Sequence, residues 1–205
     1  MYLNKVKSIL VENECFIAHC AGFVKGFSTN DLEYLDCLSN VIKTKPPISC
    51  STIKRGDRFE NRNYTGHIGL IIIPLNETSI PKAAPADAGT TEHGRNELRD
   101  MGAQASLNEI RDSVLLRKDD DNNELVIHAY DVAGVFFDRM PISFPNREDP
   151  LQPHESFQLR DVCRIFQGQS LFCLVAGALH MVEIDNAYNS YNPAEKVEIT
   201  SLYLY

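Results

Sequence analysis

Apolar residues recur at helical spacing in the first 45 residues of the chain. Residues 3–10 place apolar side chains three to four positions apart, which is the period of one helix face. Residues 32–41 repeat this spacing, and the two prolines after Lys45 end the pattern. Cys20 opens a further short apolar run, with Phe23, Val24 and Phe27 on one expected helix face. The pattern therefore predicts helices on both sides of Cys20 and a first helical turn at Cys20 itself.

The pattern then changes to short apolar runs that are typical of strands. Residues 51–74 predict two strands joined by the polar turn Glu60–Asn63. Further strand-like runs cover residues 124–138, 171–176 and 197–205. Because helices come first and closely spaced strands follow, the sequence predicts an α+β fold. We expect an antiparallel sheet of about five or six strands, with the Cys20 helix packed against it.

Two segments differ in composition from the expected core. Residues 75–123 contain Pro81 and Pro85 near their start, are rich in alanine and then in charge, and predict an insertion between strands with one short helix at residues 107–116. Residues 139–205 predict a C-terminal extension that completes the sheet. A chain of 205 residues is long enough for one sizeable core. We therefore expect a single domain, residues 1–205, with one insertion.

Composition and charge exclude several functional classes. With 43% hydrophobic and 23% charged residues, the chain has the composition of an ordinary globular protein. Its net charge is −8, which argues against a nucleic-acid partner because phosphate binding needs clustered Lys and Arg. No apolar run approaches the length of a membrane span. The N-terminal residues lack a signal-peptide pattern, so synthesis in the cytoplasm without a Sec signal is expected.

No cofactor or metal site is predicted. The six cysteines include no Cys-x-x-Cys pair, which a zinc site usually contains. Residues 119–121 are three consecutive aspartates, but they lack the alternating ligands and the glycine of a calcium loop. His93, His154 and His180 have no ligand spacing, so we expect them to be exposed or structural.

The candidate chemistry lies in one cysteine and two histidines. Cys20 is followed by His67 at the start of one β-like run and by His128 in another. A thiol nucleophile needs a base to take its proton and a third group to orient that base. We therefore predict that Cys20, His67 and His128 are catalytic, with His67 and His128 on neighbouring strands. His19 is expected to be a hydrogen-bonded neighbour that could also tune the thiolate as a cation.

Four segments resemble the NlpC/P60 family of papain-like cysteine peptidases. Residues 20–24 (Cys-Ala-Gly-Phe-Val) resemble the Cys-Ser-Gly-Phe-Val box of the family, and residues 53–59 resemble its Gly-Asp strand. Residues 66–71 resemble its His-Val-Gly-Ile strand, and residues 125–135 resemble its Val-His-Ala…Gly-Val element. The boxes occur in the family's order. Four features depart from it: His19 replaces the usual Asp, Ala21 replaces the usual Ser, the preceding Tyr-x-x-Gly-Gly segment is not visible in residues 1–18, and about 60 residues separate the two histidines.

The resemblance implies a cysteine amidase that cleaves peptidoglycan stem peptides between D-glutamate and the following diamino acid. Without a Sec signal, such an enzyme fits an antibacterial effector of the type VI kind, delivered into the periplasm of a target cell. The producer would then need a cognate immunity protein as a partner. Two alternatives stay open: a papain-like acyltransferase or peptidase with another substrate, and a catalytically idle binding module.

Overall fold

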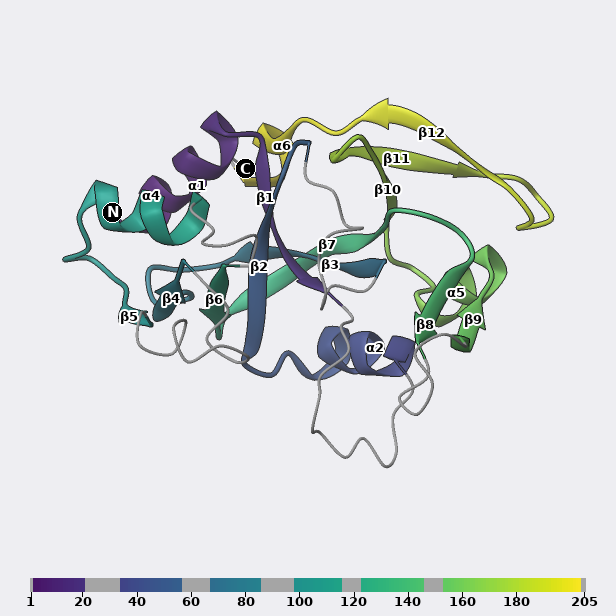
Figure 1. The fold of residues 1–205 in the computed structure, drawn as a ribbon, viewed down its shortest axis with the longest axis horizontal. Coiled ribbons are helices and arrows are strands. Elements are labelled where there is room, and N and C mark those ends of the chain that lie inside the picture. Colours follow the sequence, from purple (N-terminus) through teal and green to yellow (C-terminus); the bar gives the residue numbers. More distant parts are fainter. Residues whose placement is uncertain are drawn as a thin grey trace.

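The computed structural model describes residues 2–20, 34–56, 67–85, 98–115, 123–145 and 153–203. Most of their regular structure is strand (Figure 1). The strands are β1 (Cys15–Cys20), β2 (Ile48–Lys54), β3 (Ile68–Pro74), β4 (Lys82–Ala84), β5 (Arg99–Asp100), β6 (Glu124–Ile127), β7 (Tyr130–Phe137), β8 (Ile142–Pro145), β9 (Pro153–Phe157), β10 (Leu171–Val175), β11 (Ala178–Ile184) and β12 (Tyr191–Lys196). The helices are α1 (Tyr2–Glu12), α2 (Tyr34–Thr44), α4 (Leu107–Leu115), α5 (Leu159–Ile165) and α6 (Ile199–Tyr203).

Ten of the strands form one mixed sheet, in the order β12-β11-β10-β7-β3-β1-β2-β6-β4-β5. Neighbouring strands in this sheet are antiparallel except β7 and β10, which are parallel. β8 and β9 form a separate hairpin. The expected α+β fold, a small antiparallel sheet with a cysteine-bearing helix on it, is therefore wrong. The described fold is mainly β, with five short helices at its margins.

The segment that ends at Cys20 is a strand because it is buried on both faces. In β1, the residues from Cys15 to Ala18 are all buried, with β2 paired on one side and β3 on the other. A central strand covered on both faces shows no apolar–polar alternation, so its short apolar run cannot be distinguished from a buried helix by periodicity. The predicted helical turn at Cys20 is therefore wrong at Cys20 itself. Residues 21–24 lie outside the described residues.

The other segment predictions have mixed outcomes. The helix expected at residues 107–116 is present as α4, but β4 and β5 of the same segment pair into the edge of the main sheet. The strand expected at residues 197–205 is wrong, because α6 occupies its centre. The run at residues 124–138 is two strands, β6 and β7, and not one. The turn at Glu60–Asn63, His93 and residues 119–121 lie outside the described residues.

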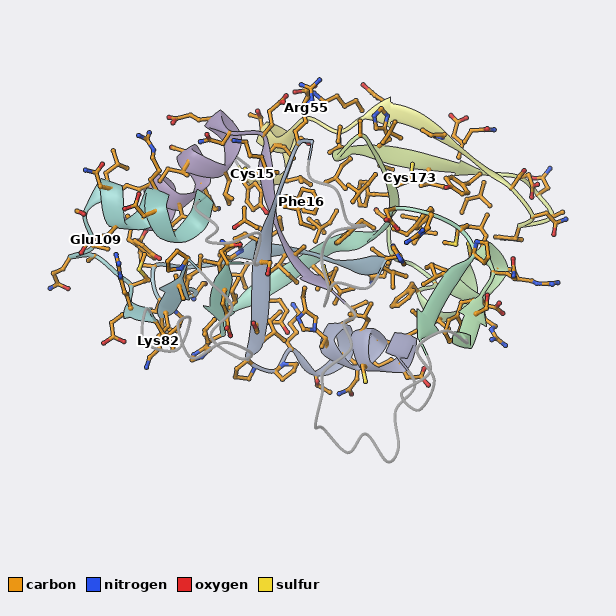
Figure 2. The ribbon with its side chains drawn as sticks, in the orientation of Figure 1. Cys15, Phe16, Arg55, Lys82, Glu109 and Cys173 are labelled. Atoms are coloured by element: carbon orange, nitrogen blue, oxygen red, sulfur yellow. The ribbon has the colours of Figure 1, made fainter. Side chains whose placement is uncertain are left out.

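The helices cover the sheet in two groups. α1 contacts both α4 and α6, which brings the first and last helices together, and α2 contacts α5 elsewhere (Figure 1). Figure 2 shows Phe16 in the middle of the molecule and Lys82 and Glu109 at its periphery. The Phe16 ring meets the Phe136 ring edge-on, with 5.4 Å between their centroids. Such aromatic pairs stabilise a core beyond their buried area.

The last helix is tied to the centre of the sheet by one hydroxyl group. The backbone N–H of Ile17 donates to the Tyr203 hydroxyl at 2.8 Å, and that hydroxyl donates to the Ile72 carbonyl at 3.2 Å. Ile17 and Ile72 are opposite each other in the β1–β3 ladder, so the hydroxyl bridges the two strands. Tyr203 is only 1% exposed, and burial raises its pKa, which keeps the phenol protonated as a donor.

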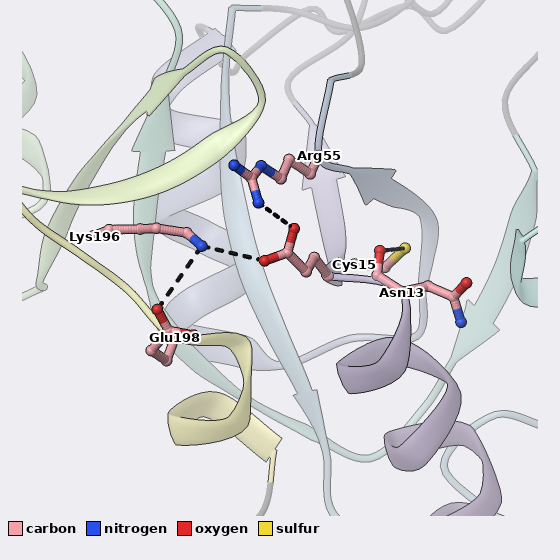
Figure 3. Close-up of polar contacts among 6 residues, drawn as sticks. Asn13, Cys15, Arg55, Lys196 and Glu198 are labelled. Atoms are coloured by element: carbon pink, nitrogen blue, oxygen red, sulfur yellow. Dashed lines mark hydrogen bonds and ion pairs between the residues drawn. The ribbon is translucent and has the colours of Figure 1, made fainter.

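A charged junction joins the beginning of β1 to the C-terminal hairpin (Figure 3). Glu14 accepts hydrogen bonds from Arg55 at 2.7 Å and from Lys196 at 3.2 Å, and Lys196 also lies 3.8 Å from Glu198. The hydrogen bonds from Arg55 and Lys196 lower the pKa of Glu14. Because all four side chains are at least partly exposed, solvent screens these pairs, and we expect them to position the hairpin more than to stabilise it.

Replacing Tyr203 with Phe tests the bridging hydroxyl. The substitution removes one oxygen and leaves the buried Ile17 N–H and Ile72 carbonyl without it, which should lower the free energy of unfolding by about 1–3 kcal/mol. Urea titration followed by circular dichroism measures this loss. Tyr188→Phe is the matched control, because Tyr188 is 51% exposed and should change stability little. Equal stability of the two variants would contradict the bridge.

Candidate functional site

Three neighbouring central strands, β1, β3 and β7, bring the candidate residues together. In the paired register, Cys20 is opposite Gly69, and Gly69 is opposite Phe136. Residues directly opposite in an antiparallel pair point to the same face of a sheet. Cys20, Gly69 and Phe136 therefore share one face at the end of these three strands.

His67 and Asp138 extend this face by one more step. His67 precedes Gly69 by two residues and Asp138 follows Phe136 by two residues, and each side chain alternates back to the same face. The backbone N–H of Asp138 donates to the His67 carbonyl at 3.1 Å, which continues the β3–β7 ladder. The His67 Nδ1 lies 3.0 Å from the Asp138 Oδ2. The ladder therefore places a carboxylate against the imidazole.

Cys20 is a diagonal neighbour of His67 on this face. Diagonal neighbours in antiparallel pairs lie about 7–8 Å apart, with their Cβ atoms somewhat closer. A cysteine and a histidine pointing to the same face at that separation are within reach of each other. The structure therefore brings Cys20 and His67 to one side of the sheet, as the proton transfer requires, with Cys20 half-buried at the end of β1.

Gly69 makes the close packing at the centre of the site possible. A Cβ added there would lie 2.7 Å from the His19 carbonyl oxygen and 2.8 Å from the Phe136 ring. Both distances are shorter than side-chain contacts tolerate, so only glycine lets the Phe136 ring lie over this position. The Gly69 of the His-Ile-Gly segment therefore has a packing role between the strands of Cys20 and Asp138.

The hydrogen bonds fix one tautomer of His67. Since the Asp138 carboxylate only accepts, Nδ1 is the protonated nitrogen. The Arg139 guanidinium hydrogen-bonds Nε2, and a guanidinium only donates, so Nε2 is the acceptor. This is the tautomer that a general base needs. The side chains of His67 and Asp138 are 21% and 17% exposed, so the pair is largely shielded from water.

Asp138 retains capacity to accept another hydrogen bond. Its Oδ1 is buried and has no hydrogen-bond partner among the residues that the structure describes, although it also lies 3.0 Å from the His67 Nδ1. A buried carboxylate oxygen is costly to leave unpaired. Among the described residues, the contact with His67 is therefore the main interaction that holds this carboxylate in place.

The structure does not bring His128 to His67. His128 is exposed in the turn between β6 and β7, whereas Asp138 follows the other end of β7. An eight-residue strand separates them, which corresponds to about 25 Å. His67 and His128 were expected on neighbouring strands, but β6, which precedes His128, lies three places from β3 in the sheet order. That expectation is therefore wrong. The residue that orients His67 in this structure is Asp138, which we did not single out from the sequence.

His19 and His180 are both hydrogen-bonded to backbone carbonyl groups, as expected, but the cation role considered for His19 is not supported. His19 points to the opposite face from Cys20, its Nδ1 lies 2.7 Å from the Ser49 carbonyl oxygen, and burial lowers its pKa. A neutral imidazole on the far face cannot act as a cation beside the thiol. His180 Nδ1 lies 3.2 Å from the Ala194 carbonyl oxygen in the β11–β12 hairpin. Cys20 itself is the last residue of a strand, and residues 21–33, over which the expected helix would continue, lie outside the described residues.

Other cysteines have environments that disfavour the thiolate. Burial is the main cause that raises the pKa of Cys37, Cys50, Cys163 and Cys173. Cys37 and Cys163 are only half-buried, so reagents can reach them as internal references for Cys20. Within the described ranges, no group of His, Cys, Asp or Glu side chains is arranged to hold a metal ion.

Comparison of the chain with family models, with curated proteins and with solved structures found no match. The NlpC/P60 resemblance therefore stays a prediction that rests on the four sequence segments alone. In the part of the chain that the structure describes, no helix has the length and apolar character needed to cross a membrane.

Gly69→Ala tests the close packing at the centre of the site. The new Cβ must displace the Phe136 ring or push β1 away, which should cost about 1–3 kcal/mol of stability. Urea denaturation of Gly69→Ala, Phe136→Leu and the double variant measures the coupling. We expect the double variant to lose less than the sum of the single losses, because the smaller side chain makes room for the methyl group. Strict additivity would show that the two positions are not in contact.

Proposed function

We propose that the chain is a cysteine-dependent hydrolase in which Cys20 is the nucleophile, His67 the general base and Asp138 the residue that orients His67. The observation that carries the proposal is the register of β1, β3 and β7. It aligns a thiol, an imidazole and a carboxylate on one face, with the imidazole in the tautomer that accepts a proton at Nε2. This arrangement matches the chemical needs of thiol catalysis in the order Cys…His…Asp.

The proposed reaction runs in two balanced steps. The Cys20 proton passes to the His67 Nε2 while the sulfur attacks the amide carbonyl carbon; the protonated imidazole then returns that proton to the leaving amine as the C–N bond breaks. Water next attacks the thioester, His67 takes one proton from it, and the carboxylic acid leaves as the thiol is restored. Asp138 stabilises the imidazolium in both steps by accepting from Nδ1.

The finer part of the proposal is the substrate. The four resembling segments suggest amide bonds of peptidoglycan stem peptides, and therefore an exported antibacterial effector with a cognate immunity protein as its partner. This part is supported by the sequence resemblance and not by the site geometry. Digestion of purified sacculi, with chromatography of the released muropeptides, tests it. Release of no new muropeptides by a protein that is reactive at Cys20 would favour an acyltransferase or a peptidase with another substrate.

The reactivity of Cys20 tests the proposed triad without any substrate. Iodoacetamide at neutral pH, with mass-spectrometric mapping of each cysteine, should alkylate Cys20 faster than Cys37 or Cys163, whose pKa values are raised by burial. His67→Ala should remove this advantage, because no base then takes the thiol proton. If Cys20 reacts no faster than the two reference cysteines, the chain is an idle binding module and the proposal is wrong.

A set of matched variants tests the third residue. His67→Ala should reduce amide cleavage at least about 100-fold, and Asp138→Asn should reduce it at least about tenfold through the wrong tautomer. Asp131→Asn is the matched control, because Asp131 lies on the same strand and pairs with Lys45 at the surface. His128→Gln should also leave the rate within about threefold of the parent. A large loss in His128→Gln with a mild effect in Asp138→Asn would restore His128 as the third residue.

A further inference from the structure

Arg139 occupies the position on His67 that the thiol proton must reach. Its guanidinium hydrogen-bonds Nε2, on the opposite side of the ring from Asp138. Nε2 cannot accept a proton while a cation donates to it, and a protonated Nε2 would repel the guanidinium. Any turnover by the proposed triad therefore requires Arg139 to leave His67 and to find another partner.

The described residues offer Arg139 no such partner. Arg139 is exposed, and among the described side chains it forms no ion pair with a carboxylate. A guanidinium pairs best with a planar carboxylate, through two parallel hydrogen bonds. A carboxylate of the substrate would therefore be a suitable partner for the guanidinium once Arg139 leaves His67.

A pocket beside Arg139 carries a positive side chain, Arg160, which suits a substrate with a carboxylate. Met140 and Pro141, which directly follow Arg139, line a surface pocket of about 460 Å³ together with Tyr191 and Arg160. None of the described residues lining it is acidic, although the chain as a whole carries a net charge of −8. The Tyr191 ring on the pocket wall meets the ring of Phe137, the residue before Asp138, edge-on with 5.0 Å between their centroids, which places the pocket beside the proposed triad.

The far wall of this pocket is a preorganised hairpin tip. Asp185 accepts hydrogen bonds from the backbone N–H groups of Ala187, Asn189 and Ser190 and from the Ser190 hydroxyl. These bonds hold Tyr188 at a positive φ of 57°, with its side chain exposed on the pocket wall. A wall that is already ordered loses little entropy on binding, so the pocket is suited to a ligand.

We propose that Arg139 is a specificity residue that binds a carboxylate of the substrate beside the reacting carbonyl, and that without such a carboxylate it exchanges between His67 Nε2 and solvent, which leaves part of the protein able to take the Cys20 proton. This inference rests on the proposed function and adds the substrate class: amides or acyl compounds with a free carboxylate next to the cleaved bond. The rest of such a substrate extends into the pocket beyond Met140.

Two alkylating agents that differ only in charge test the inference. Iodoacetate carries a carboxylate next to its reacting carbon, and iodoacetamide carries a neutral amide there. In the parent protein, Cys20 should have a higher ratio of iodoacetate to iodoacetamide rates than in Arg139→Gln, by about fivefold or more. Arg139→Lys should give an intermediate ratio, because an ammonium attracts the carboxylate without the bidentate geometry.

Arg164→Gln is the matched control. It removes the same charge from an exposed side chain that pairs with Asp161 and does not contact His67, so the ratio should stay at the parent value. The inference would be overturned if Arg139→Gln kept the parent's ratio of iodoacetate to iodoacetamide rates at Cys20. It would also be overturned if Arg164→Gln lowered this ratio as much as Arg139→Gln does. These outcomes differ from failure of the proposed function, in which His67→Ala leaves the iodoacetamide rate of Cys20 unchanged.

The neutral reagent gives a second, independent readout. Removing the guanidinium frees Nε2, so Arg139→Gln should alkylate with iodoacetamide at least as fast as the parent, while its iodoacetate rate falls. A parallel loss with both reagents would mean that Arg139 only supports the structure around His67, and the inference would be wrong. Urea titration of each variant shows whether the fold is retained.

Discussion

The candidate site depends on the pairing of three strands over a few residues. If β1 slipped by one position against β3, Cys20 would point to the opposite face from His67, because side chains alternate along a strand. Gly69 opposes this slip, because the Phe136 ring and the His19 carbonyl oxygen of β1 both pack against it at distances that no residue with a Cβ atom would allow. The chemistry of the proposed site is therefore a property of main-chain register.

The sequence indicated the proposed nucleophile and base but not the proposed third residue. Cys20 and His67 each adjoin a short apolar run, which is a local signal. The choice between His128 and Asp138 is not local, because both residues flank the apolar strand β7 at opposite ends. Antiparallel pairing decides it: the start of β3 must meet the end of β7, so the residue beside His67 is the one after Phe137. An acidic residue at the end of an apolar strand was the signal available in the sequence.

The predicted fold class was wrong, and the physical reason is related. A strand that is central and covered on both faces, such as β1, loses the alternation that identifies a strand, so the run that ends at Cys20 was not recognised as one. The amphipathic helices α1, α2 and α4, which have one exposed face, were predictable from their spacing. The C-terminal edge of the sheet was foreseen in part, since residues 171–176 were predicted as a strand and residues 139–205 as completing the sheet. The β4–β5 edge was not foreseen, because residues 75–123 were predicted as an insertion.

The Tyr203 bridge also has a consequence for how the molecule assembles. It connects Ile17 to a residue 186 positions later, so the ladder between β1 and β3 lacks this link until nearly all of the described chain has been made. Contacts of such long sequence separation slow folding, because loop-closure entropy must be overcome before they form. During synthesis on the ribosome, the strand that carries Cys20 therefore lacks this cross-link to β3 until the C-terminal helix has been made.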